Sequence, residues 1–247
     1  MRVLLLNTKS EFLKLLNKKK YLVITILSAL ISLMRLGGSM LIAKVSRGEL
    51  VIKGNLIASM LSFVTDILVP LVVFMAVTDL FASEMQEDTF KASLLRPLTR
   101  FKVIISKCAG VWLLVCAVML AMFCVCFIMQ IISGNGLGGT LHMLSAYIID
   151  TIPVIALIGL ALFINSVSKS PTLAMLLCIV VYIFFKYLNL YVSPYGQMVF
   201  TAYSQWHKIW LGSTLPIGAL ASKLGILFGS VLILYTASYI IIENKDF

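Results

Sequence analysis

Acidic and basic side chains follow one another in a fixed order over Ser83–Lys107, between two long apolar runs of the chain. Glu84, Glu87 and Asp88 come first and precede a helix-like run that ends at Pro97. Carboxylates stabilise the amino end of a helix, because its backbone N–H groups carry partial positive charge. The segment therefore predicts a short charged helix that docks on a partner in water, although an ordinary solvated loop has the same composition.

Four charged side chains lie inside apolar runs, at similar depths from one end of each run. They are two cations and two carboxylates: Arg35, Asp66, Asp150 and Lys186. A charge at such depth costs on the order of 2.5 to 3.5 kcal/mol on insertion scales, so each should face protein or water and find a partner. We expect that these charges neutralise one another. They either line the outer part of a translocation route or form structural ion pairs that fix helix packing.

Other residue types that carry chemistry do not combine into a recognisable site. His142 and His207 are isolated in the sequence, and Gly134, Gly136 and Gly139 match G-x-G-x-x-G only after an apolar run, where a turn is expected. The cysteines show no disulfide or zinc spacing: Cys108, Cys116, Cys124, Cys126 and Cys178. The sequence also lacks a phosphate loop and the motifs of serine hydrolases and zinc proteases. We therefore expect no catalysis, metal or cofactor in this chain.

Composition places most of the chain in lipid. Hydrophobic residues make up 61% of the 247 residues and charged residues 12%, and the mean hydropathy is +1.05. A bilayer core needs about 20 apolar residues in a helix. We expect an all-α fold with six transmembrane helices in a single transmembrane domain, 21–247. Their predicted ranges are Tyr21–Ala43, Leu56–Ala82, Val103–Ile132, His142–Val167, Pro171–Tyr191 and Ser222–Ile242.

The first 20 residues alternate leucines with lysines, which predicts a basic amphipathic helix in the lipid headgroup region. Six of the Lys and Arg residues lie in this segment and five more in 83–107. Positive charge favours the cytoplasmic side, so both termini are predicted to lie in the cytoplasm of a multi-pass protein of the cytoplasmic membrane. The net charge of +10 then indicates topology and contact with anionic lipid, and nucleic-acid binding is not expected.

The segment 192–221 is aromatic and amphipathic, and it falls on the predicted outer side. Trp206 and Trp210 lie four residues apart, on one face of a helix. This spacing predicts a short helix that anchors the protein at the outer interface. Direct recognition of a substrate by these side chains is the less favoured alternative.

The order of residues in the charged segment resembles the first cytoplasmic loop of type-2 ABC transporter permeases. The residues that carry the resemblance are Glu84, Glu87, Thr89, Leu94, Leu95, Pro97, Thr99, Arg100 and Lys107. The amphipathic start, the six expected spans and the short tail are similar to that family as well. The chain departs from the pattern at Asp88, where the family often has glycine.

The resemblance implies a permease subunit that pairs with a second permease, identical or homologous, and with two copies of an ATP-binding subunit that hold ATP and magnesium. The loop would then be a coupling helix. Its contacts would come from Phe90, Leu94 and Leu95, while Glu84 and Glu87 would meet basic groups of the ATPase or pair with Arg96 and Arg100. The implied activity is export of an amphipathic or hydrophobic compound such as a peptide or drug.

Two other functions fit the sequence without the resemblance. One is a membrane immunity or assembly protein that binds a peptide toxin without transporting it. The other is an ion-coupled transporter with Asp66 or Asp150 as a proton relay, but the chain shows no pair of interrupted helices in an inverted repeat.

Overall fold

The structure, a computed structural model, describes residues 2–45, 56–87, 99–132, 139–191, 199–207 and 217–244. The regular elements within those ranges are all helices, so the predicted all-α class is confirmed for them. In chain order they are α1 (Arg2–Leu16), α2 (Lys19–Val45), α3 (Leu56–Phe63), η1 (Val64–Leu68), α4 (Val69–Leu80), α5 (Ala82–Gln86), α7 (Arg100–Ile132), α8 (Thr140–Ile149), α9 (Val154–Val167), α10 (Pro171–Tyr191), η3 (Phe200–Tyr203) and α12 (Ile217–Glu243).

Five helical stretches of the described chain are long and apolar enough to cross a membrane. They are Met60–Gln86, Arg100–Ile132, Thr140–Val167, Pro171–Leu188 and Ala221–Glu243. The remaining predicted passage, 21–43, coincides with the 27-residue helix α2, about 40 Å long. Many side chains in the second half of α2, including that of Arg35, lie outside the described residues.

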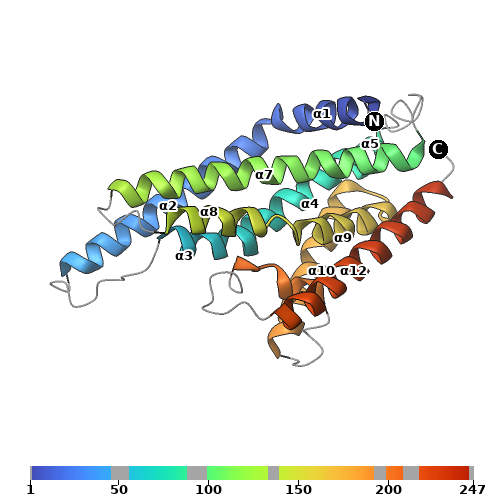
Figure 1. Cartoon of the computed structure of the whole chain (residues 1–247). Coiled ribbons are helices and arrows are strands. Elements are labelled where there is room, and N and C mark those ends of the chain that lie inside the picture. The colour runs from blue at the N-terminus through green and yellow to red at the C-terminus, as the bar shows by residue number, and fades with distance from the viewer. Residues whose placement is uncertain are drawn as a thin grey trace.

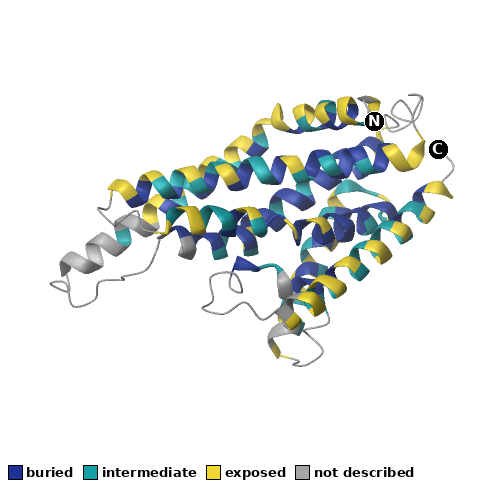
Figure 2. Cartoon of the chain, in the orientation of Figure 1, coloured by how far each residue is buried: buried dark blue, intermediate teal, exposed yellow. Residues whose placement is uncertain are grey.

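The longest helix, α7, runs along the molecule and organises the helices around it (Figure 1). α1 lies beside the first part of α7, while α9 packs between α4 and α12. The buried side chains concentrate on α4, α9 and the inner side of α7, and the outward faces of α10 and α12 are exposed (Figure 2). Those exposed faces are rich in leucine, isoleucine and phenylalanine, as expected for surfaces that lipid or another membrane protein covers.

The predicted passage 56–82 is helical, but one turn of it is a π-helix. That turn, η1, ends just before Pro70. Proline has no N–H, and its ring clashes with the carbonyl group four residues earlier, here that of Asp66. Widening the helix over Val64–Leu68 accommodates the ring. The carbonyl oxygen of Asp66, which cannot receive a hydrogen bond from Pro70, accepts one of 3.1 Å from the Tyr182 hydroxyl.

The predicted passage 142–167 is interrupted in its middle. α8 ends at Ile149, turns occupy the next four residues, and α9 begins after Pro153. The missing N–H of proline fits the first turn of a helix, so Pro153 stands where one helix can stop and another can start. Asp150 caps the carboxyl end of α8 at this break.

The two sides of α1 differ in their residues. Its buried side against α7 carries Asn7, Thr8, Glu11 and Leu15. Its exposed side carries several apolar residues together with two lysines: Val3, Leu5, Leu6, Lys9, Leu13, Lys14 and Leu16.

Candidate functional site

The two ends of the charged segment are joined by a buried ion pair. Lys107 Nζ on α7 lies 2.6 Å from Glu84 Oε2 on α5, and the Lys107 side chain is 0% exposed. Lys107 also donates to the carbonyl oxygen of Leu80 at 3.2 Å. A buried ion pair stabilises a fold only when further hydrogen bonds satisfy the remaining donors and acceptors of both partners. For the Lys107 ammonium group, the carbonyl oxygen of Leu80 provides such a hydrogen bond. The pair thus closes the base of the segment 84–107.

The helix α1 contributes two more charges to this base. Glu11 Oε2 lies 3.7 Å from Lys107 Nζ, and Lys14 Nζ lies 3.0 Å from Glu84 Oε1 and 3.4 Å from Glu11 Oε2. Burial alone would lower the pKa of Lys14, but the hydrogen bond and charge of Glu84, together with those of Glu11, outweigh it and raise the pKa above 10.5. We call Glu11, Lys14, Glu84 and Lys107 the base cluster. Its two cations balance its two carboxylates.

Close packing holds α1 against α7 at the base cluster. A Cβ atom added at Gly110 would lie 3.2 Å from Glu11 Cβ and 3.3 Å from the backbone nitrogen of Phe12. One turn earlier on α7, Ser106 accepts a 2.6 Å hydrogen bond from the side-chain amide of Asn7. Only a glycine lets the two helices come this near without a shift.

A further carboxylate fixes the turn between α1 and α2. Asp79 on α4 lies 3.1 Å from Lys18 Nζ and 2.6 Å from Lys20 Nζ, and it accepts a 2.7 Å hydrogen bond from Tyr21. The amino-terminal helix is therefore held by α4, α5 and α7 together.

The carboxylate of Glu84 is turned inward to Lys107 and Lys14. Its expected contact with basic groups of an ATPase, or with Arg96 and Arg100, stays a prediction. Arg100 donates a 3.0 Å hydrogen bond to the carbonyl oxygen of Glu243, at the end of α12. Glu87 is exposed. The expected docking residues of the coupling helix lie outside the described residues: Thr89, Phe90, Leu94, Leu95 and Pro97.

A second group of polar side chains lies deep within the predicted spans. Asp66 on η1 places Oδ1 3.1 Å from Lys186 Nζ on α10 and accepts a 2.5 Å hydrogen bond from Gln205. The side chain of Lys186 is 41% exposed and that of Asp66 23% exposed. A half-exposed ion pair at this depth cannot face lipid without a large cost.

Asp150 is paired with a residue that the sequence gave no reason to place near it. Its Oδ2 lies 2.5 Å from His207 Nδ1, and its Oδ1 accepts a 2.7 Å hydrogen bond from the His207 backbone N–H. The other ring nitrogen, Nε2, lies 3.2 Å from Ser62 Oγ. Asp150 therefore meets His207, which is isolated from it in the sequence, while Lys186 pairs with Asp66. Whether Arg35 takes part in neutralising these charges stays a prediction, because its side chain lies outside the described residues.

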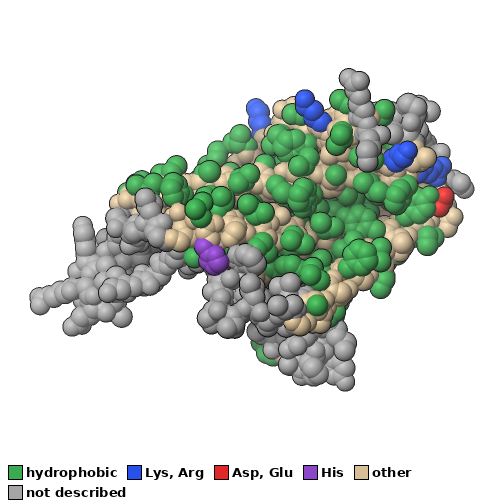
Figure 3. Space-filling view, in the orientation of Figure 1, with side chains coloured by type: hydrophobic (Ala, Val, Ile, Leu, Met, Phe, Trp, Pro, Cys, Tyr) green, Lys and Arg blue, Asp and Glu red, His purple; other side chains and the backbone are tan. Residues whose placement is uncertain are grey.

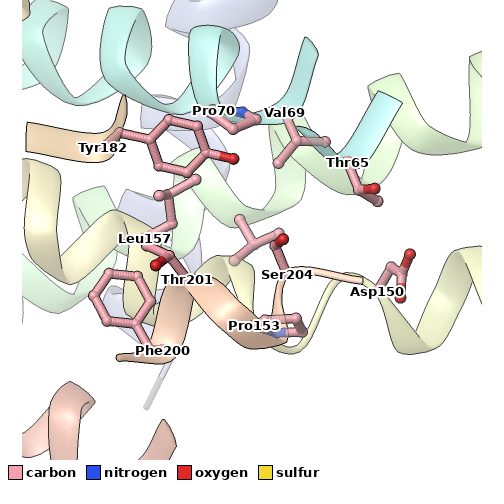
Figure 4. A pocket seen from close by; sticks show the side chains of 11 residues that line it. Thr65, Val69, Pro70, Asp150, Pro153, Leu157, Tyr182, Phe200, Thr201 and Ser204 are labelled. Atoms are coloured by element: carbon pink, nitrogen blue, oxygen red, sulfur yellow. The ribbon is translucent and has the colours of Figure 1, made fainter. Parts of the chain in front are cut away.

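A small cavity lies where η1, the break between α8 and α9, α10 and η3 meet (Figure 4). Its volume is about 20 Å³. The polar lining groups are Thr65, Asp150, Tyr182, Thr201 and Ser204. π-turns and interrupted helices are both common at functional sites of membrane proteins, and the two meet here.

Trp206, one of the two outer aromatic residues, is 6% exposed and belongs to the hydrophobic core, in a turn after η3. Its expected role as an interfacial anchor stays a prediction. Burial of Trp206 follows from its neighbours Gln205 and His207, which hold this turn against Asp66 and Asp150. Trp210 lies outside the described residues.

Sequence reasoning missed Asp79, Gln205 and His207 as partners of intramembrane or near-membrane charges. Asp79 could have been found, because a carboxylate inside an apolar run always needs a partner. Gln205 and His207 gave no periodic signal. Among the described residues, no group of three or more His, Cys, Asp or Glu side chains could hold a metal ion.

Comparison with protein families identifies a relationship. The family model described as ABC-2 family transporter protein matches residues 8–186, which include the second half of α1, all of α7 and α9 and most of α10. No curated protein matches the chain. The matched region contains the whole base cluster and the Asp66–Lys186 pair. The chain belongs to the ABC-2 family of transporter proteins, as a multi-pass membrane permease.

Proposed function

We propose that this chain is the permease subunit of an ATP-driven exporter in the cytoplasmic membrane, powered by two copies of a separate ATP-binding subunit. Family membership supports a transport role over a toxin-binding immunity protein. The sequence has no phosphate loop, so ATP and magnesium would bind to the partner. The proposed substrate is an amphipathic or hydrophobic compound such as a peptide or drug.

The observation that carries this proposal is the Glu84–Lys107 pair. It closes the base of the segment that contains Leu94 and Leu95, so a force applied to that segment reaches α5 and α7 through one buried contact. Lys107 and Glu84 also contact Glu11 and Lys14 of α1. A push from an ATPase would thus move three helices together, as rigid-body switching requires.

The length of α7 supports a cytoplasmic position for the base cluster. Its 33 residues span about 50 Å, whereas the hydrocarbon core of a bilayer is about 30 Å thick. About 13 residues of α7 therefore extend beyond the hydrocarbon core. α1 packs near the amino-terminal end of α7, at Ser106 and Gly110. The visible Lys and Arg side chains lie over α1 and at the end where α7 begins (Figure 3), which favours a cytoplasmic side for both termini.

The Asp66–Lys186 pair supports the position of the translocation route. Because this half-exposed pair is unsuited to lipid, the surface formed by η1 and α10 should face water or a second permease subunit. We propose that two permeases, identical or homologous, meet around this surface and that the pair lines the outer part of the route between them. Membrane lipid covers the other outward faces.

The proposal is tested by purifying the tagged chain from its native membrane in mild detergent. We expect it to copurify with a protein that carries a phosphate-loop motif, and the complex to hydrolyse ATP in proteoliposomes. Export that follows a proton gradient and does not need ATP would instead support the ion-coupled transporter.

A further inference from the structure

The segment 199–207, which includes η3, is attached to the membrane helices through two carboxylates. Gln205 donates a 2.5 Å hydrogen bond to Asp66 on η1. His207 contacts Asp150 at the end of α8 twice, through its backbone N–H at 2.7 Å and through ring atom Nδ1 at 2.5 Å. The same segment contributes residues to the wall of the cavity in Figure 4, which η1 and α9 also line. Detachment of the segment would therefore open this cavity.

The two attachments differ in how the charge of the carboxylate is balanced. Asp66 has its own cation, since Lys186 Nζ lies 3.1 Å away. Among the described ion pairs, Asp150 has His207 as its partner, and their side chains are 0% and 4% exposed, so water screens neither. The carboxyl end of α8 adds partial negative charge at the same place. Within the described residues, the charge of Asp150 is thus balanced when the pair holds an added proton.

The hydrogen bonds of His207 accommodate the pair with and without that proton. Without it, Nδ1–H donates to Asp150 and Nε2 accepts from the Ser62 hydroxyl, 3.2 Å away. With it, Nε2–H donates to the same hydroxyl oxygen, and the pair has no net charge, whichever residue holds the shared proton. A buried carboxylate without a compensating charge costs far more free energy than a balanced pair. The proton therefore decides how favourable this contact is.

Histidine is the side chain whose ordinary titration falls between about pH 5 and 8. The chain has two, and the other, His142, is exposed on α8. The described elements packed around the segment carry further charged or titratable side chains that include Asp66 on η1, Tyr147 and Asp150 on α8, Tyr182 and Lys186 on α10 and Lys223 on α12. Ordinary carboxyl groups titrate near pH 4, and ordinary tyrosines and lysines near pH 10. A response of the segment near neutral pH should therefore come from a histidine.

We propose that the segment 199–207 is a latch that closes with one added proton on the Asp150–His207 pair and loosens when that proton leaves. Undocking returns both side chains to water, where an ordinary histidine is neutral above about pH 6.5. Docking and proton binding must then favour each other by the same factor. Above that pH, the equilibrium constant for docking should fall about tenfold per pH unit until the docked pair also loses its proton.

Amide hydrogen exchange tests the latch on the full-length chain in nanodiscs, without an ATPase, so the result does not depend on the proposed export function. The backbone N–H of His207 is bonded to Asp150 while the segment is docked, so its protection factor reports docking. Exchange is measured from about pH 6 to about pH 8.5 and divided by the intrinsic rate at each pH. We expect the protection factor of the peptide 199–207 to fall about tenfold per pH unit above about pH 6.5, while that of α9 stays constant.

His207→Asn is the diagnostic variant, because the asparagine amide can replace Nδ1–H as the donor to Asp150 but does not titrate. Its protection factor should be independent of pH. Asp150→Asn is a second test: an added proton on His207 would then be a buried charge without a partner, so protection should no longer fall as the pH rises. His142→Asn is the matched control, since it removes the exposed histidine and should keep the wild-type response.

Each outcome of these measurements decides the proposal. A constant protection factor in the wild type would overturn it and show that the charge of Asp150 is balanced without an added proton. An equal fall in His207→Asn, or loss of the fall in His142→Asn, would overturn it as well. If His207→Asn does not fold, Asp150→Asn decides: disappearance of the fall supports the latch, and an unchanged fall contradicts it.

Discussion

Glu84 and Lys107 stand at opposite ends of the charged segment, yet their side chains meet at 2.6 Å in the interior of the protein. The pair makes the intervening residues a closed loop on a fixed base. Glu11 and Lys14 of α1 join the same base, so the amino-terminal helix is part of it. A loop held this way can pass a displacement to the membrane helices, which a loop on a flexible base could not do.

Replacing Lys107 with methionine should destabilise the protein strongly. The change leaves Glu84 and Glu11 as buried carboxylates without their shared cation, and removing one partner of a buried pair costs about 3 to 5 kcal/mol. Thermal unfolding in detergent measures the loss. Lys102→Met, on an exposed site of the same helix, serves as the control and should change stability by about 0.5 kcal/mol or less.

Replacing Glu84 as well as Lys107 should recover part of that stability. In Glu84→Met with Lys107→Met, one carboxylate is gone and Lys14 still lies beside Glu11. Apolar replacements of both partners of a buried pair are often neutral. A double variant no more stable than Lys107→Met alone would show that the two side chains do not interact as described.

Gly110→Ala should push α1 away from α7. The added Cβ would be 3.2 Å from Glu11 Cβ and 3.3 Å from the Phe12 backbone nitrogen, and the backbone cannot yield as a flexible side chain does. We expect a loss of about 1 to 3 kcal/mol, as for other overpacked positions. Gly225→Ala on α12 has open space around its Cβ and should be neutral or slightly stabilising. Equal stability of the two variants would argue against close packing of α1 on α7.

The contribution of Lys14 should depend on pH only in alkaline solution. Its pKa is raised in the folded protein by Glu84 and Glu11, so folding favours the charged form. That contribution is complete below the unfolded pKa near 10.5 and is lost as the pH rises through the folded value. The difference in stability between wild type and Lys14→Met should therefore be constant from pH 6 to about 9 and shrink above about 10.5. A difference that shrinks near neutral pH would contradict the assignment.

Asp66→Asn should affect transport more than folding if the pair with Lys186 lines the route. Both side chains are partly exposed, so water can solvate the lysine that is left without its partner. We expect membrane yield close to wild type and about a tenfold loss of export, which corresponds to about 1.4 kcal/mol in the transport barrier. The exchange Asp66→Lys with Lys186→Asp restores the pair with its polarity reversed. If that exchange also restores full export, the pair has only a structural role.

The helices could be predicted because their signal is local. An apolar run of about 20 residues can satisfy its backbone only as a helix in lipid, and α10 has the same bounds, Pro171–Tyr191, as the predicted passage. Proline disturbs a helix, and Pro70 and Pro153 lie at the two irregular points of these passages. The sequence could not show that one would produce a π-turn and the other a complete break, because both depend on neighbouring helices.

The partners of the charged residues could be predicted only in part. A charge in an apolar run shows that a partner exists, but not which one, since the partner is set by packing between distant segments. Asp150 meets His207 because the turn after η3 folds inward. The sequence also gave no sign that the Trp206 side chain is buried in the core, because its neighbours Gln205 and His207 contact Asp66 and Asp150 on distant helices.

The central claim is that the loop closed by Glu84 and Lys107 receives the force of an ATPase through Leu94 and Leu95. Its most direct test is ATP hydrolysis and export by the reconstituted complex after replacement of both leucines with aspartate. The account predicts a permease that inserts and folds normally but no longer exports, with hydrolysis no longer stimulated by substrate. Normal substrate-stimulated hydrolysis together with normal export in that variant would contradict it.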